Sequence, residues 1–192
     1  MTPHIARLVF IVAILAWGAI RFPYQMRKVP VARADRGWPE KLRMTAAALG
    51  IGLIPVGYTV SGFPRGADFA FRPELAWIGA AVFALSLALF YSAHRDLGRN
   101  FSNSLVVRQG HTLVTSGIYA HIRHPMYAGF WLWAVAQALL LQNWFVGLAG
   151  FVGFGILFFG RIEQEEKLMR ETFGEDYERF ARRTSRLVPW IY

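Results

Sequence analysis

The stretch that decides the fold is His124–Gly160, which reads HPMYAGFWLWAVAQALLLQNWFVGLAGFVGFGILFFG and contains no Lys, Arg, Asp or Glu. As a single helix it would be about 56 Å long, whereas the hydrocarbon core of a bilayer is roughly 30 Å thick. Gln142 and Asn143 interrupt the apolar run near its middle. The stretch therefore predicts a tight helical hairpin in a membrane, with helices over Met126–Leu141 and Trp144–Gly160.

Three further apolar runs precede this hairpin, over Ile5–Ile20, Met44–Phe63 and Leu75–Ala93. Each approaches or reaches the roughly 17–25 residues of a spanning helix. The first run lacks a clear small-x-small cleavage site and is followed by other spans, so it predicts a membrane anchor rather than a signal peptide. Pro55 is expected to kink the second run. We predict an all-α integral membrane protein with about five transmembrane helices.

The composition agrees with a membrane protein. Of the 192 residues, 55% are hydrophobic and 17% are charged, and the mean hydropathy is +0.31, which excludes a disordered chain and an ordinary soluble domain. The chain has no Cys, which excludes disulfides, thiol nucleophiles and Cys-ligated zinc sites. In a soluble protein the net charge of +9 would suggest nucleic acid as a partner.

The positions of the basic residues explain that charge differently. Of the 21 Lys and Arg, 18 fall on one side of the five predicted spans, and the others are Arg7, Arg65 and Arg72. Because Lys and Arg mark the cytoplasmic side, we expect the N-terminus outside and the C-terminus inside. The excess charge then serves topology and contact with anionic membrane lipids, not nucleic acid.

Two polar segments belong to the predicted cytoplasmic side. Residues 94–123 form a polar connector. Residues 161–173 predict a charged helix that continues the last span and ends at Phe173-Gly174, since Gly commonly follows a helix C-terminus. A second short amphipathic helix should follow, with acidic residues in its first turn and Arg in its last, as the helix dipole favours.

Two groups of side chains at the predicted cytoplasmic ends of the spans could bind a ligand or take part in a reaction. His124, Pro125 and Tyr127 open the fourth span, where free backbone N–H groups favour an anionic ligand, although an interfacial aromatic belt explains the same residues. Arg161 and Glu165 share a helix face, so they form either a solvated ion pair or a site in which Arg161 grips a carboxylate. No cluster of His and acidic residues has the spacing of metal ligands.

Four sequence blocks carry a resemblance to a known family. They are HTLVTSGIY (His111–Tyr119), RHPMYxG (Arg123–Gly129), RxxxEE (Arg161–Glu166) and FGxxY (Phe173–Tyr177). Over about residues 98–190 the chain resembles the isoprenylcysteine carboxyl methyltransferase family, integral-membrane enzymes that use S-adenosylmethionine (SAM). The resemblance implies a SAM-binding methyltransferase region over residues 94–192. The first three predicted spans form an N-terminal three-helix membrane region over residues 1–93, whose topology is compatible with the family.

The resemblance also implies roles for single residues. Those matched to SAM binding are His111, Thr112, Leu113, Val114, Tyr119, His124, Pro125, Met126, Tyr127 and Glu165. Arg161 matches the arginine assigned to the substrate carboxylate. Gln109 lies only two residues before His111, closer than the family's cofactor-contacting glutamine, and is not carried over.

The resulting hypothesis is a SAM-dependent methyltransferase that acts on the carboxylate of a lipophilic substrate such as an isoprenylcysteine. A carboxylate is already ionised at neutral pH and needs no general base, whereas an amine must first lose a proton. Phospholipid N-methylation and small-thiol S-methylation, which related families carry out, are the enzymatic alternatives. A small membrane transporter is the non-enzymatic alternative, and it would require charged or polar groups at mid-membrane depth. The predicted spans contain only Ser86, Gln137 and a few similar groups, which argues against transport.

Overall fold

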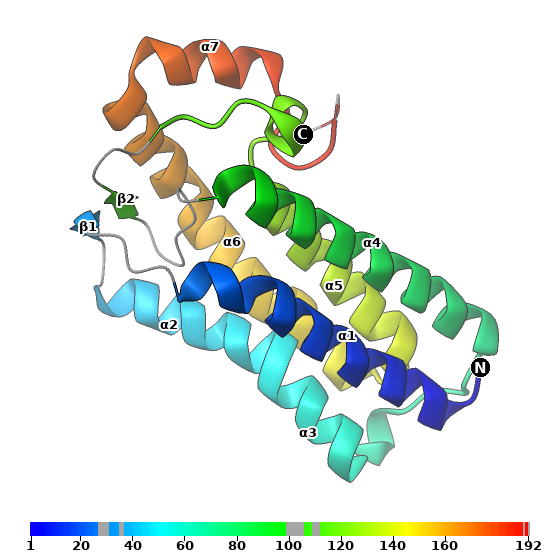
Figure 1. Cartoon of the computed structure of the whole chain (residues 1–192). Coiled ribbons are helices and arrows are strands. Elements are labelled where there is room, and N and C mark those ends of the chain that lie inside the picture. Colours follow the sequence, from blue (N-terminus) through cyan, green and yellow to red (C-terminus); the bar gives the residue numbers. More distant parts are fainter. Residues whose placement is uncertain (27–30, 35–36, 99–105, 109–111, 190, 192) are drawn as a thin grey trace.

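The computed structural model is a bundle of helices that run past one another in alternating directions (Figure 1). It describes residues 1–26, 31–34, 37–98, 106–108, 112–189 and 191. Its helices are α1 (Pro3–Gln25), α2 (Trp38–Ala48), α3 (Ile54–Ser61), α4 (Pro73–Leu97), α5 (Pro125–Leu141), α6 (Trp144–Phe173) and α7 (Glu175–Arg183). Shorter helical turns are η1 (Leu49–Leu53), η2 (Arg65–Ala67) and η4 (Gly117–Ala120).

The predicted all-α membrane fold is confirmed. In the part of the chain that the structure describes, four helices are long and apolar enough to cross a membrane, namely α1, the continuous helix Trp38–Ser61, α4 and α6, and α5 is a shorter apolar helix. The chain is therefore a multi-pass membrane protein. The N-terminus and α7 lie at opposite ends of the bundle, as an odd number of passes requires (Figure 1).

The turn of the predicted hairpin lies at Gln142 and Asn143, as expected. Gln142 has φ +47°, and its side chain exchanges two hydrogen bonds with the backbone of Arg72, at 2.8 and 2.9 Å. The Asn143 side chain accepts a hydrogen bond from the backbone N–H of Val146 and so caps the start of α6. These contacts fasten the turn to the start of α4.

The helix Trp38–Ser61 contains a π-helical turn, η1, just before Pro55. Proline lacks an N–H and its ring crowds the carbonyl four residues earlier, which widens a helix locally. Here α2 and η1 also lie very close to α6. A Cβ on Gly50 would come within 2.2 Å of the Ala149 carbonyl oxygen, and Gly153 faces Gly50 from α6. Small residues at both positions therefore permit this helix contact.

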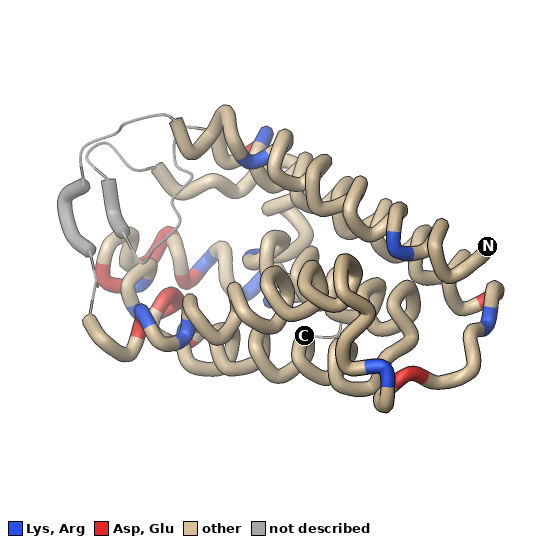
Figure 2. Tube along the Cα trace, turned by 90° about the horizontal axis from the view of Figure 1, so that it is seen from below, with Lys and Arg blue, Asp and Glu red and all other residues tan. Residues whose placement is uncertain are grey.

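The charged end of the bundle follows the sequence-based prediction. Helix α6 continues past Gly160 to Phe173, Gly174 has φ +52°, and α7 follows. Helix α4 extends to Leu97, so the connector begins later than predicted. Strand β2 (Val106–Arg108) within the connector pairs antiparallel with β1 (Val31–Ala34), a pairing that was not predicted. Figure 2 shows the charged residues concentrated toward this end of a mostly uncharged trace.

Candidate active site

A cavity of about 610 Å³ lies among α1, α2, η1, α5 and α6. Much of its wall is apolar, and the residues that form this part include Ile14, Trp17, Ala47, Ile51, Val56, Phe130, Trp133, Phe154 and Leu157. Polar side chains line the end where α5 begins and α6 leaves its apolar segment, among them Arg21, Arg123, Tyr127 and Arg161. The cavity therefore joins an apolar chamber to a polar mouth.

The described residues to which the family resemblance gives a site role all line this one cavity. They are Thr112, Leu113, Val114, Tyr119, His124, Pro125, Met126, Tyr127, Arg161 and Glu165. They come from the connector, η4, the start of α5 and the charged part of α6. His111 and Gln109 lie outside the described residues.

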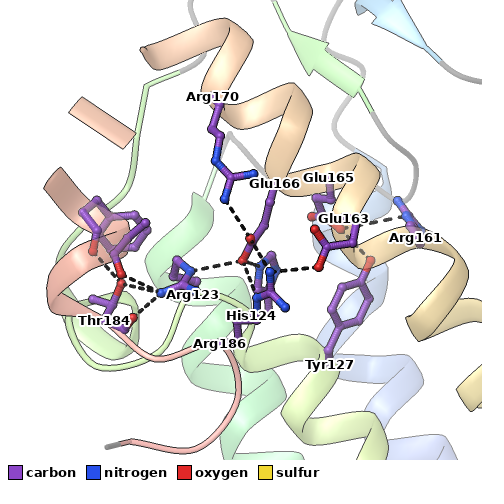
Figure 3. A network of polar contacts seen from close by, with 12 residues as sticks. Arg123, His124, Tyr127, Arg161, Glu163, Glu165, Glu166, Arg170, Thr184 and Arg186 are labelled. Carbon is purple, nitrogen blue, oxygen red and sulfur yellow. Dashed lines mark hydrogen bonds and ion pairs between the residues drawn. The ribbon is translucent and has the colours of Figure 1, made fainter. Parts of the chain in front are cut away.

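Arg161 and Glu165 contact other side chains as well as each other. The Tyr127 hydroxyl donates a hydrogen bond of 2.5 Å to Oε2 of Glu165, and Nε of Arg161 lies 4.0 Å from the same oxygen (Figure 3). Nη1 of Arg161 lies 3.4 Å from Oε1 of Glu40, on α2. The Arg161 side chain is only 8% exposed, so the interpretation as a solvated i,i+4 pair is wrong. The guanidinium is instead held between two carboxylates at the cavity wall.

Glu166 forms the centre of a second, buried cluster. Its carboxylate lies 2.9 Å from Nη2 of Arg186 and 3.3 Å from Nε of Arg123, and Nε2 of His124 lies at 3.4 Å. Nη2 of Arg170 also lies at 3.3 Å (Figure 3). Glu166 and Arg170 are four residues apart on α6, as in a solvated helix pair, but the Glu166 side chain is 1% exposed. Glu165 and Glu166 are adjacent on α6, so their side chains point about 100° apart. Glu165 lines the cavity, and Glu166 therefore points into the buried cluster.

This cluster fastens the C-terminal segment to the start of α5. The backbone N–H of Arg123 donates to the Ser185 carbonyl at 2.8 Å, and that of His124 donates to the Arg186 carbonyl at 3.0 Å. Nη1 of Arg123 also donates to the carbonyls of Ala181 and Thr184. His124 and the residues after it are therefore positioned by a segment about sixty residues later in the chain.

Two tyrosines complete the polar mouth. Burial, and then the negative charge of Glu165, raise the pKa of Tyr119, so its phenol stays neutral. Tyr177 also lines the cavity and is 2% exposed, and its hydroxyl has no hydrogen-bond partner in the described part of the chain. A buried hydroxyl of this kind favours a ligand that supplies the missing hydrogen bond. Sequence reasoning gave Tyr177 no role, although the FGxxY block contains it.

Comparisons with known proteins agree with these blocks. The model of the isoprenylcysteine carboxyl methyltransferase (ICMT) family matches residues 77–171. Protein-S-isoprenylcysteine O-methyltransferase B of Arabidopsis thaliana is 33% identical over 133 residues, which are 65% of this chain and 68% of that protein. The protein-S-isoprenylcysteine O-methyltransferases of Schizosaccharomyces pombe and Rattus norvegicus are 35% and 32% identical, over 52% and 70% of this chain.

The matched segment spans 43% of the yeast relative and 51% of the rat relative, so the chain corresponds to about half the length of these proteins. It spans just over two thirds of the plant protein. The matched residues include the start of α5 and the charged part of α6, which build the polar mouth of the cavity. On this similarity, the chain belongs to the isoprenylcysteine carboxyl methyltransferase family.

Proposed function

We propose that the protein is a SAM-dependent methyltransferase that esterifies the carboxylate of a lipophilic substrate of the isoprenylcysteine class. One observation carries the proposal. A single cavity combines an apolar chamber with Arg161 and with every described residue matched to SAM binding. The names of the relatives, all protein-S-isoprenylcysteine O-methyltransferases, support the same acceptor.

The residues at the polar mouth fit SAM as the methyl donor. Glu165 offers carboxylate oxygens to ribose hydroxyls or an ammonium group, and the unpartnered hydroxyl of Tyr177, among the described residues, offers a further hydrogen bond. The rings of His124 and Tyr127 stack with centroids 5.6 Å apart and form a flat aromatic wall. When bound, SAM supplies a methyl group on a positively charged sulfonium. We propose that these residues and the other matched positions hold it.

The remaining residues fit a lipophilic acid. Arg161 provides a planar guanidinium that can form two hydrogen bonds with a carboxylate. The apolar wall formed by α1, η1 and α5 suits a hydrocarbon tail, which would enter from the bilayer between spans. Such a site aligns the carboxylate and keeps water away from it, which is the main requirement of an in-line methyl transfer.

The alternatives are less consistent with the site. An arginine has no evident use beside a cationic amine acceptor. For a transporter, polar groups inside the spans should line a path, but Ser86 donates to the Gly129 carbonyl, and the Gln137 amide donates to the carbonyls of Gly50 and Val146. These hydrogen bonds give both side chains a structural role between helices.

We also propose the orientation that the basic residues predict, with the N-terminus outside and the SAM site facing the cytoplasm. The polar mouth lies at the same end of the bundle as the charged part of α6 and α7 (Figures 1 and 2). SAM would then bind from the cytosol. In this arrangement residues 94–192 supply most of the donor site, and residues 1–93 supply much of the apolar wall.

The proposed function is tested by methyl transfer from radiolabelled SAM in detergent. The acceptor panel contains S-prenylcysteines with a free carboxylate, phospholipids with a primary amine, and small thiols. We expect label only on the prenylcysteines, in a product that base hydrolyses, as an ester requires. Base-stable label on an amine or thiol would refute the carboxylate assignment, and no transfer to any acceptor would refute the methyltransferase activity.

A further inference from the structure

Glu40 is a buried carboxylate that none of the family blocks contains. It lies in the first turn of α2 and is 5% exposed. Among the described residues neither of its oxygens has a hydrogen-bond partner, and Oε1 lies 3.4 Å from Nη1 of Arg161. A buried carboxylate costs several kcal/mol unless a counter-charge offsets it. Arg161 is therefore a counter-ion of Glu40, and the pair joins α2 to the cavity wall.

Glu40 lies closer to the Arg161 guanidinium than Glu165 does. Glu165 is farther away, at 4.0 Å from Nε, and already accepts the hydrogen bond from Tyr127. The sulfur of Met44 lies 3.9 Å from Nη1. Arg161 lines the cavity, whereas Glu40 is not among the residues that line it. Glu40 therefore contacts the guanidinium from α2 without facing the cavity. An acceptor carboxylate in the cavity and Glu40 would thus share one guanidinium.

The sharing of Arg161 between Glu40 and the acceptor affects the rate because the acceptor carboxylate loses its negative charge in the proposed reaction. An acceptor oxygen bonds to the methyl carbon while the methyl–sulfur bond breaks and its electron pair stays on sulfur. The negative charge of the acceptor and the positive charge of the donor disappear together, and no proton moves. A guanidinium that grips the carboxylate strongly stabilises the reactant more than the transition state. A strong grip therefore improves binding but slows transfer.

We propose, on the basis of the proposed function, that Glu40 is a positioning residue that shares Arg161 with the acceptor carboxylate and so keeps that carboxylate weakly held and nucleophilic. The same contact serves the end of the reaction. The ester product is neutral and leaves Arg161 without a partner from the substrate. Glu40, together with the more distant Glu165, then still balances the charge of the guanidinium, which favours release of the ester.

The test is the variant Glu40→Gln, which keeps the side-chain shape and removes the charge. The acceptor is an N-acetyl-S-prenylcysteine, and its Kd is measured calorimetrically with S-adenosylhomocysteine present. We expect this Kd to fall about 3- to 10-fold, which is less than the full effect of a hydrogen bond to a charged group because Arg161 is shared and not lost. KM for this acceptor should fall similarly, and kcat should fall with it. The Kd of the corresponding methyl ester should not change, because the ester has no charge to share.

Two further variants accompany it. Glu40→Asp draws the carboxylate back by one methylene and should change Kd, KM and kcat in the same direction by a smaller factor. Glu163→Gln is the matched control, because Glu163 is an exposed carboxylate on α6 that pairs at 2.9 Å with Arg186 rather than with a cavity residue. It should leave the acceptor Kd, KM and kcat unchanged.

The outcomes separate the two proposals. If the unaltered protein transfers no methyl group to a carboxylate, the proposed function fails and this inference fails with it. If the unaltered protein is active and Glu40→Gln leaves KM unchanged or raises it, only the role of Glu40 is refuted, since a merely structural residue would weaken acceptor binding. If Glu40→Gln does not fold, Glu40→Asp decides, and an unchanged or raised KM in that variant refutes the proposal.

Discussion

Glu166→Gln is expected to destabilise the protein strongly. The substitution keeps the shape of a side chain that is 1% exposed but removes the charge that pairs with Arg123, Arg186 and Arg170. Breaking a buried ion pair from one side typically costs about 3–5 kcal/mol, because the other charge stays buried. Arg170 is 43% exposed and can turn to water, so Arg123 and Arg186, at 11% and 22%, dominate the loss. We therefore expect a loss of about 3 kcal/mol in the free energy of unfolding.

The assay is a denaturant titration of the purified protein in mixed micelles, alongside Glu163→Gln. Glu163 contacts the same Arg186 but is 67% exposed, so its loss should cost less than about 1 kcal/mol. A second measurement on the same variants is the affinity for S-adenosylhomocysteine. It should fall in Glu166→Gln, because the cluster positions His124 at the cavity. A loss of stability no larger than that of the control would show that the buried cluster does not hold the C-terminal segment in place.

Four other outcomes are expected. Arg161→Ala should cut kcat/KM for a carboxylate acceptor about 30- to 1000-fold while SAM affinity stays nearly intact. Arg161→Lys should restore only part of kcat/KM, because an ammonium lacks the planar fork of a guanidinium. An equal fall in SAM affinity would place Arg161 in the donor site. Tyr127→Phe removes the 2.5 Å hydrogen bond to Glu165 and should weaken S-adenosylhomocysteine binding about 5-fold by calorimetry, and unchanged binding would contradict this. Gly50→Ala should lower the free energy of unfolding by about 1–3 kcal/mol, since its Cβ would meet a carbonyl oxygen at 2.2 Å, whereas Gly57→Ala, with open space, should not. A tag at the N-terminus should be accessible from outside the cytoplasm and one at the C-terminus only from inside; tags accessible from the same side would refute five passes.

The membrane fold could be predicted from the sequence because the signals for it are local. A run of apolar residues of the right length crosses a bilayer whatever surrounds it, since every backbone polar group must be satisfied within the helix. The turn at Gln142 and the helix end at Gly174 likewise follow from residues adjacent in sequence. The sequence blocks also identified ten of the residues that line the cavity, Thr112, Leu113, Val114, Tyr119, His124, Pro125, Met126, Tyr127, Arg161 and Glu165, because they carry a family pattern.

The tertiary structure alone decided which charges meet. Glu165 and Glu166 are neighbours in sequence, and only the rotation of α6 about its axis places one at the cavity and the other in the buried cluster. Arg161 meets Glu40 across more than a hundred residues, and Arg186 meets Glu166 through the return of the C-terminal segment. Such contacts depend on how helices pack, and packing is set by the whole set of side chains at each interface, including small ones such as Gly50. Sequence therefore determined the spans and the candidate site residues, whereas the counter-ion of each charged residue followed from helix packing.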